Sequence, residues 1–241
     1  MVLLKVCILG NYRFLILLCI TAVLFSCQEE KKTVPPVKQT IVKKVVRKKK
    51  TKAKKTAKII YPSTATAVDF FTEYGKKNPE TRVLISTDFG DMEIELFKDT
   101  PIHRASFIYL VKEGCFDMAG FYRIIEDFVI QAGRSDLESL AAFKNLRKNY
   151  KIPPEFRKNH VHKRGTVAAA RDWTYNPSKL STAFEFYILV GTDDYTHIDG
   201  EHTIFGRVVK GMSTADKISR VKTAADDWPL KDVNMKVKVI R

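Results

Sequence analysis

Short runs of apolar or alternating residues, separated by turn residues, recur along most of this 241-residue chain and constrain its fold more than any other feature. Runs of this length and polarity are typical of β-strands. They occur at 82–87, 92–96, 120–125, 128–132, 165–170, 185–190, 203–209 and 233–239. Helical patterns are fewer: one is capped by Thr100, has Pro101 at its first position and stops at Gly114, and another spans 212–220. The pattern predicts an all-β domain with helical caps, and periodicity leaves both a barrel and a sandwich open.

The positive charge of the chain is concentrated in one segment. The chain has 42 Lys and Arg against 27 Asp and Glu, a formal net charge of +15. Residues 28–58 hold 13 of the basic residues and 2 Glu, whereas residues 59–241 hold 27 basic and 25 acidic residues, a net of +2. A nucleic-acid-binding domain carries its positive charge on a folded face. We therefore expect no nucleic-acid partner.

The charged segment itself has the composition of a linker. Residues 28–58 lack aromatic residues and glycine, contain Pro35-Pro36 and are then rich in Lys and Arg. Such a segment buries too little apolar surface to offset the entropy of ordering it. We predict a disordered basic linker, which with Cys27 forms the region 27–58. It would serve as a spacer extended by charge repulsion, as a segment attracted to envelope polyanions such as lipid headgroups, or as both.

The N-terminal residues resemble an export signal. Lys5 and Arg13 are followed by an apolar run at 14–25, which is shorter than the ~20 residues of a membrane span. The segment Leu24-Phe-Ser-Cys27 resembles the lipobox of bacterial lipoproteins. We therefore predict a signal peptide at 1–26 and lipidation of Cys27, which would anchor the protein to a bacterial membrane facing the periplasm or the cell exterior. The alternative is an uncleaved apolar anchor.

The cysteines and histidines indicate no metal site. Cys115 would be the one cysteine left in the mature domain, and we expect it to pack as a small apolar residue. His160 and His162 form a His-X-His pair on a Lys-rich loop, without an obvious third ligand. We expect both to be exposed to solvent rather than bound to a metal. No cofactor is expected.

Four sequence blocks carry a resemblance to a known family. They are Phe121-Tyr-Arg-Ile-Ile-Glu-Asp-Phe-Val-Ile-Gln-Ala-Gly133, Gly165-Thr-Val-Ala-Ala-Ala170, Phe186-Tyr-Ile188 and Ile198-Asp-Gly-Glu-His-Thr-Ile-Phe-Gly206. In this order they resemble the cyclophilin family of peptidyl-prolyl cis/trans isomerases. The resemblance implies that residues 82–241 form a closed eight-stranded antiparallel β-barrel with two helices. The preceding residues 59–81 form a predicted helical extension, because Thr64 to Tyr74 has amphipathic spacing.

The resemblance also implies a substrate site. Rotation about a prolyl amide requires a donor near the prolyl nitrogen and an apolar pocket for the ring, with no nucleophile, metal or base. Arg123 occupies the catalytic position of the family. The positions of the proline pocket are Phe128, Val129, Tyr187, Ile198 and His202, and those that hold the substrate backbone are Gln131, Ala170 and Arg171.

Two residues of the implied substrate site differ from the family pattern. Glu185 stands where the family usually has Gln, and its carboxylate could form an ion pair with Arg123. His197 stands where a tryptophan grips cyclosporin in well-studied relatives, so weak binding of that inhibitor is expected.

Three further segments lie near the implied site. Tyr122 replaces the usual His, and Glu126-Asp127 replaces a Pro-Gly turn; we expect both changes to be tolerated at the rim. The polar aromatic loop 172–177 is a candidate for sequence preference. Pro153 to Phe156 resembles a family loop with a structural role.

Together these features predict an exported, membrane-tethered and monomeric isomerase that acts on proline-containing unfolded or extended polypeptides. A first alternative is a catalytically weak module that only captures proline-containing segments, and Glu185 is the residue that keeps it open. A second is an envelope-adhesion protein in which the basic linker binds polyanions and the domain is a stable spacer.

Overall fold

The computed structural model describes residues 61–117, 119–134 and 150–241. The predicted signal peptide, Cys27 and the basic linker lie outside the described residues. None of the helices in the described ranges has the length and hydropathy needed to cross a membrane.

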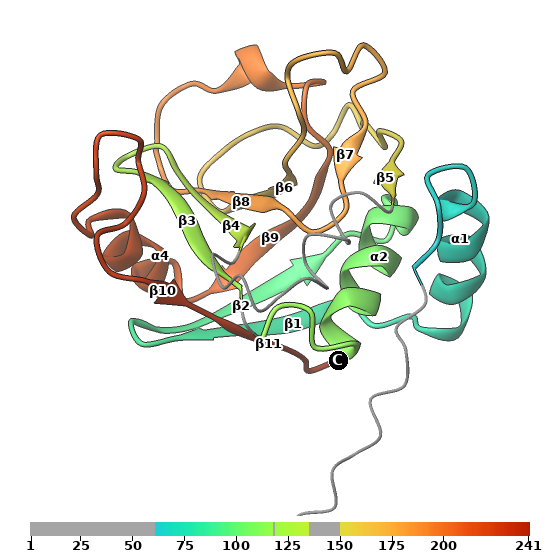
Figure 1. The fold of residues 1–241 in the computed structure, drawn as a ribbon, viewed down its shortest axis with the longest axis horizontal. Helices are drawn as coiled ribbons and strands as arrows, with labels where there is room; N and C mark the ends of the chain where they lie inside the picture. The colour runs from blue at the N-terminus through green and yellow to red at the C-terminus, as the bar shows by residue number, and fades with distance from the viewer. Residues whose placement is uncertain (1–60, 118, 135–149) are drawn as a thin grey trace, which may run out of the picture. The chain divides into compact units, whose positions relative to one another are not determined.

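One antiparallel sheet dominates the fold, with strand order β10-β3-β4-β8-β6-β9-β2-β1-β11. Its strands are β1 (Arg82–Thr87), β2 (Gly90–Leu96), β3 (Gly120–Ile125), β4 (Val129–Arg134), β6 (Thr166–Ala169), β8 (Phe186–Leu189), β9 (Ile204–Lys210), β10 (Val233–Asn234) and β11 (Lys236–Val239). A separate short pair consists of β5 (Lys151–Ile152) and β7 (Ser181–Thr182). The two ends of the sheet, β10 and β11, are neighbours in the sequence, so the sheet curls into a nearly closed barrel (Figure 1).

The predicted all-β fold with helical caps is confirmed, but the strand count differs. The sheet has nine strands rather than eight, because the closing run 233–239 is split at Met235. Before Met235 the chain pairs with β3, through Val233 and Phe121, and after it the chain pairs with β1. Met235 is 2% exposed, and its N–H donates to the carbonyl of Ala119. One segment thus changes partner to close the barrel.

The helices are α1 (Ala67–Lys77), α2 (Pro101–Lys112), α4 (Met212–Ser219) and the 3-10 turn η1 (Thr196–Ile198). In the described part of the chain three α-helices are therefore present where the barrel alone predicts two, because α1 belongs to the extension before β1. Helices α2 and α4 lie at opposite ends of the barrel in Figure 1, and both contribute residues to the main core.

Helix α2 is capped differently from the prediction. Thr100 makes no side-chain capping bond. Instead the two carboxylate oxygens of Glu155 accept the N–H groups of Ile102 at 3.1 Å and His103 at 2.9 Å. A buried carboxylate at a helix N-terminus satisfies donors that have no partner within the helix. The segment 153–156 has the structural role that was predicted for it.

The extension packs against α2. Phe71 of α1 is fully buried, and Tyr109 of α2 makes edge contacts with Phe70 and Tyr74. Arg104 of α2 donates to the carbonyl groups of Asn78 and Gly75 at the end of α1. Cys115 is a free cysteine and is buried, as expected.

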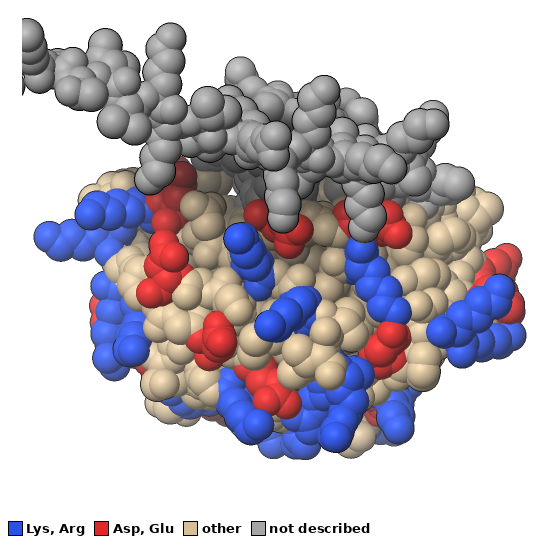
Figure 2. Space-filling model, turned by 90° about the horizontal axis from the view of Figure 1, so that it is seen from below, with Lys and Arg blue, Asp and Glu red and all other residues tan. Residues whose placement is uncertain are grey.

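The outer face of the sheet around β2 carries a ladder of ion pairs. Glu93 pairs with Arg82 at 2.9 Å and Lys210 at 3.0 Å, and Glu95 pairs with Arg82 at 3.2 Å and Arg207 at 2.7 Å. The view from below shows acidic and basic side chains interspersed rather than separated by sign (Figure 2). This arrangement matches the small net charge of residues 59–241.

The alternation of side chains along the central strands creates two apolar clusters. Ile130 of β4 and Phe186 and Ile188 of β8 point into the main core. Their neighbours Val129 and Tyr187 point to the other face, where they form a second cluster. Successive residues of a strand face opposite sides of the sheet. The second cluster is the foundation of the candidate site.

Candidate active site

A row of side chains crosses three neighbouring strands on the outer face of the barrel. Arg123 of β3 lies opposite Gln131 of β4, and Gln131 lies opposite Tyr187 of β8. Tyr187 in turn lies opposite Ala168 of β6. Residues directly opposite one another in an antiparallel sheet share a face, so the strand register alone places the guanidinium, the amide and the aromatic ring side by side.

This row borders a cavity of about 350 Å³. Ten residues line it: Arg123, Phe128, Val129, Gln131, Ala170, Arg171, Trp173, Tyr187, Ile198 and His202. Nine of them were predicted as site residues from the sequence, and Trp173 comes from the loop predicted to set sequence preference. A larger cavity of about 540 Å³ is lined by other residues, among them Phe97 and Lys163. None of the predicted site residues lines it.

Arg123 stands at the polar end of the cavity and is held loosely. Its side chain is 41% exposed, and its Nε lies 3.3 Å from Oδ2 of Asp227, which is 39% exposed. The loop that carries Asp227 is fixed by a backbone hydrogen bond, because Ile124 N–H donates to the Asp227 carbonyl at 2.9 Å. Asp227 also has a positive φ of 65°, a conformation that Asp tolerates better than most residues.

The two predicted site residues that differ from the family pattern lie outside the cavity lining. Glu185 is 6% exposed, and its carbonyl accepts the N–H of Ala170 at 2.8 Å. Among the described residues the carboxylate that pairs with Arg123 is that of Asp227 rather than that of Glu185. His197 lies in η1, is exposed and faces the ring of Tyr195 at 6.5 Å.

A buried hydrogen-bonded chain supports the wall of the cavity. His162 Nδ1 lies 2.6 Å from Oδ1 of Asp199, and His162 Nε2 lies 2.8 Å from the hydroxyl of Tyr187. With Nδ1–H donating to the carboxylate, Nε2 accepts the hydroxyl proton, which requires a neutral imidazole. Burial lowers the pKa of His162 and raises the pKa of Tyr187, so both groups stay neutral.

The position of His162 contradicts its predicted exposure. Its side chain is 0% exposed, because Asp199 and Tyr187, both distant in sequence, enclose it. The hydroxyl of Tyr187 is therefore bonded to His162. Tyr187 lines the cavity with its apolar ring. His160 was also expected to be exposed, but its side chain is 11% exposed, and its Nε2 lies 3.3 Å from Oδ2 of Asp99.

His202 forms a second wall of the cavity. Its Nδ1 lies 3.0 Å from the carbonyl of Ala169 and donates a hydrogen bond to it. Its ring meets the ring of Tyr187 edge-on, with centroids 5.3 Å apart. Burial lowers the pKa of His202 to about 4. The imidazole is therefore neutral at physiological pH and contributes an aromatic surface.

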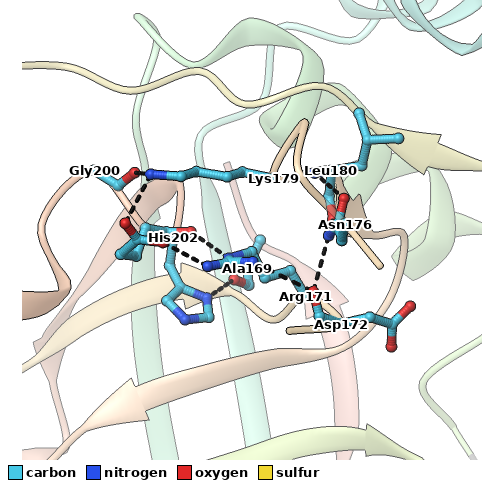
Figure 3. Close-up of polar contacts among 9 residues, drawn as sticks. Ala169, Arg171, Asp172, Asn176, Lys179, Leu180, Gly200 and His202 are labelled. Atoms are coloured by element: carbon cyan, nitrogen blue, oxygen red, sulfur yellow. Dashed lines mark hydrogen bonds and ion pairs between the residues drawn. The ribbon is translucent and has the colours of Figure 1, made fainter. Parts of the chain in front are cut away.

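Arg171, the second guanidinium of the cavity, is held tightly. Its side chain is 5% exposed, and its Nη2 lies 2.5 Å from Oε2 of Glu201. Its Nε also donates to the Glu201 carbonyl at 2.7 Å. Lys179 reaches the same carboxylate at 2.7 Å and the Gly200 carbonyl at 3.1 Å (Figure 3). The loop that carries Arg171 is thus tied to the loop that carries His202.

Tyr122 lies at a β-bulge rather than at an exposed rim. The register of β3 against β4 shifts between Phe121 and Arg123, which leaves Tyr122 as the extra residue. Tyr122 is 8% exposed, accepts a hydrogen bond from the amide of Gln131 and packs near Trp228. Bulges re-aim side chains next to active sites, and this one turns Arg123 toward the cavity. Glu126 and Asp127 are exposed, as predicted.

The chemistry of the lining limits what the cavity can do. None of its described lining residues is a Ser, Thr, Cys, Asp or Glu. Nor do the described residues contain a group of His, Cys, Asp and Glu that could hold a metal ion. A cavity with an aromatic and aliphatic wall and a guanidinium at one end suits binding and polarisation of a neutral group.

Three supporting residues were not predicted as part of the site. Asp227 lies in a polar loop, and its sequence neighbours give no sign that it faces Arg123. Asp199 lies inside the recognised block 198–206, but nothing in that block shows that it faces His162. Glu201 lies inside a recognised block, but its contact with Arg171 joins two separate loops. No local signal identifies such contacts, because each depends on the closure of the barrel.

Comparison with known proteins agrees with this description. The family model described as "Cyclophilin type peptidyl-prolyl cis-trans isomerase/CLD" matches residues 82–239. A probable peptidyl-prolyl cis-trans isomerase of Brucella suis is 34% identical over 151 residues, covering 59% of this chain and 74% of the relative. A peptidyl-prolyl cis-trans isomerase of Acinetobacter baylyi is 30% identical over 174 residues, covering 66% of this chain and 87% of the relative.

Solved structures show the same fold. A cyclophilin type peptidyl-prolyl cis-trans isomerase of Cryptosporidium parvum superposes with a TM-score of 0.57 at 20% identity, covering 67% of this chain and 98% of that one. Its structure in the presence of the dipeptide Ala-Pro gives a TM-score of 0.56, covering 66% and 99%. At this identity the likeness supports the fold alone.

Proposed function

Because this chain belongs to the cyclophilin-type peptidyl-prolyl cis-trans isomerase family, we propose that Arg123 stabilises the twisted prolyl amide in the cavity and that the natural substrates are exported polypeptides. The family assignment makes the chain a peptidyl-prolyl cis-trans isomerase. The proposal concerns which residues carry out the reaction and where it takes place.

The barrier to rotation defines what the site must do. A peptide C–N bond has partial double-bond character and a rotation barrier of ~18–20 kcal/mol. At the twisted geometry the prolyl nitrogen loses its resonance with the carbonyl and becomes a hydrogen-bond acceptor. A stabilisation of ~7 kcal/mol at that geometry would accelerate rotation about 10⁵-fold.

The observation that carries the proposal is the position of a partly exposed guanidinium at one end of an apolar cavity. Arg123 offers N–H donors that the Asp227 contact at Nε does not use. Tyr187, Ile198 and Phe128 offer apolar surface for the proline ring, and Gln131 and Arg171 lie where a peptide backbone could bind. The donors act only when the nitrogen becomes an acceptor, so the interaction is stronger in the transition state than in the ground state.

Removal of the water around the amide adds to the effect. The planar amide is more charge-separated than the twisted one, so a weakly polar environment destabilises the planar form relative to the twisted form. The walls around the ring are aromatic or aliphatic, and the buried ends of Tyr187 and His202 are occupied by His162 and Ala169. The hydroxyl of Tyr187 and Nδ1 of His202 are therefore engaged within the protein, and both residues present ring surface to the cavity.

The test is the cis/trans exchange rate of an Ala-Pro peptide with purified full-length protein in detergent. We expect acceleration by the native protein and a loss of about 100-fold or more in Arg123→Ala, the scale seen when one preorganised donor is removed. Arg123→Lys should recover part of this activity, because it restores a donor but not the planar fork. Equal activity in all three proteins would refute the assigned role of Arg123. If the native protein captured proline peptides without accelerating exchange, the weak-capture alternative would hold instead.

The cellular site of the reaction is a separate part of the proposal. The apolar run before Cys27 and the basic linker after it support export and tethering through lipid, which would place the isomerase beside newly exported chains. Prolyl isomerisation takes tens of seconds without catalysis and can limit folding. Incorporation of labelled palmitate into the native protein, and none into Cys27→Ser, would support lipidation. An uncleaved chain without label would support the apolar-anchor alternative.

A further inference from the structure

Two exposed aromatic side chains project from the loop 171–180, and only one of them borders the cavity. Trp173 is 62% exposed and Tyr175 is 99% exposed. Of the two, Trp173 is among the described residues that line the cavity. A large exposed aromatic surface that continues an apolar cavity is a feature of binding sites rather than of ordinary protein surface.

Trp173 is held in place by its neighbours. The guanidinium carbon of Arg171 lies 4.1 Å from the centroid of the indole ring, which is a cation–π contact. The His202 ring lies edge-on at 5.4 Å. Arg171 itself is fixed by Glu201. One side of the indole is therefore covered by a fixed cation, and the rest of the ring is exposed without being free to turn.

The loop behind Trp173 is also fastened. Asn176 is 8% exposed and donates to the carbonyl groups of Asp172 at 3.0 Å and Leu180 at 2.9 Å, while it accepts the N–H of Leu180 at 2.9 Å. Figure 3 shows these bonds, together with Lys179 reaching across to Gly200. Lys151 pairs with Asp172 at 2.8 Å. A platform that is ordered before binding loses little conformational entropy when a ligand packs on it.

The charges around Trp173 are paired, which decides the kind of ligand. Glu201 pairs with both Arg171 and Lys179, which leaves a net charge of +1 for these three residues, and Asp172 pairs with Lys151. An approaching peptide side chain therefore meets an aromatic face whose nearby cations are all engaged in ion pairs. Aromatic and large aliphatic side chains gain most from contact with such a face.

We propose that Trp173 forms the wall of an additional subsite, which takes the side chain of a residue flanking the proline and favours aromatic and large aliphatic residues. The inference rests on the proposed use of the adjacent cavity for the proline ring. Trp173 is here a specificity-determining residue, because it contacts the substrate beside the reacting bond.

The experiment compares peptides rather than absolute rates. In the full-length protein, kcat/KM is measured for peptides with Phe, Leu, Ala or Glu immediately before the proline, and for a second set with the same residues immediately after it. The matched control is Tyr175→Ala, which removes an exposed aromatic residue of the same loop that does not line the cavity. Trp173→Phe retains a smaller aromatic face. Thermal unfolding of each variant establishes that the fold is intact.

In one of the two peptide sets we expect the native protein to prefer Phe and Leu over Ala by about threefold to tenfold, the range that an aromatic pair supplies. Trp173→Ala should lower this ratio to about one, Trp173→Phe should retain part of it, and Tyr175→Ala should leave it unchanged. No preference in the native protein, or the same ratio in Trp173→Ala, would overturn the proposal. Failure of the proposed function would give a different result. In that case kcat/KM for the Ala-containing peptides would be the same in the native protein and in Arg123→Ala.

Discussion

The cavity contains two arginines that differ in almost every respect except their charge. Among the described residues, Arg123 is 41% exposed and contacts one carboxylate at 3.3 Å, whereas Arg171 is 5% exposed and is bound by both the side chain and the carbonyl of Glu201. A guanidinium that must follow a rotating amide needs unused donors and freedom to adjust. A guanidinium that carries an aromatic platform needs neither. Under the proposed function, one arginine would act in the reaction, whereas the other supports the wall that carries Trp173.

Exchange of each arginine for glutamine should separate these roles most clearly. Arg123→Gln should lower kcat/KM by about 100-fold and leave the midpoint of thermal unfolding nearly unchanged, because the side chain is half exposed. Arg171→Gln should lower that midpoint by about 5 °C, because it breaks bonds that join two loops. Peptide exchange rates and calorimetry check the two effects. A large loss of stability in Arg123→Gln would remove the distinction between the two residues.

Acid should weaken the wall of the cavity that His202 forms. The pKa of His202 is lowered to about 4, from an ordinary value near 6.5, because burial disfavours its charged form. Between these values the unfolded chain binds a proton that the folded chain does not, so stability falls as the pH decreases from 6.5 to 4, by up to about 3 kcal/mol. The lowered pKa of His162 acts in the same direction.

The pH dependence can be measured by denaturant titration at a series of pH values. His202→Gln should reduce the slope of stability against pH in this window. His197→Gln is the matched control, because His197 is exposed in the neighbouring turn. An unchanged slope in His202→Gln would show that the wall does not depend on a neutral imidazole at this position.

The hydrogen bond between Tyr187 and His162 should show coupling when either partner is removed. Tyr187→Phe leaves Nε2 of His162 without the hydroxyl, and His162→Leu leaves the hydroxyl and Asp199 without the imidazole; each should cost about 1–3 kcal/mol of unfolding free energy. The double variant should cost less than the sum of the two single changes. Additive losses in a double-mutant cycle would contradict a direct bond.

The smallest effect on activity is expected from loss of the contact between Arg123 and Asp227. Asp227→Asn removes a carboxylate that offsets the charge of Arg123 across a partly exposed gap, where such pairs contribute about 0.2–1 kcal/mol. We expect kcat/KM to rise by up to about fivefold at low salt, and this gain to fade as salt screens the charge. Assays at two salt concentrations test it. A large loss of activity would instead make Asp227 an anchor for Arg123, comparable to Glu201 for Arg171.

The strand pattern and the recognised blocks predicted much of the molecule because they depend on local sequence. The runs 128–132 and 185–190 were predicted as strands, and they contain most of β4 and all of β8. Nine residues that the family resemblance assigned to the substrate site do line one cavity. Their spacing follows from the strands that carry them.

Contacts between distant loops were not predictable in this way. His162 is followed by Lys163 and Arg164, a polar setting that indicates exposure, yet Asp199 and Tyr187 bury it. Glu155 caps α2 from a loop far along the chain, in place of the adjacent Thr100. Such contacts form only when the closed barrel brings distant loops together. The periodicity of apolar residues in the sequence therefore does not predict them.

Because the closing segment is divided at Met235 and lies at the end of the chain, it affects the order in which the strands of the barrel pair during folding. Strands β10 and β11 follow every other strand of the sheet in the sequence, and β10 pairs with β3, the strand of Arg123. A ribosome, and a translocation channel if the chain is exported, would deliver this segment after all the others. Long-range pairing of this kind is slow and comes late in folding. The strand that bears Arg123 would therefore gain its second neighbour last, and the newly made chain would become a catalyst only after its own barrel has closed.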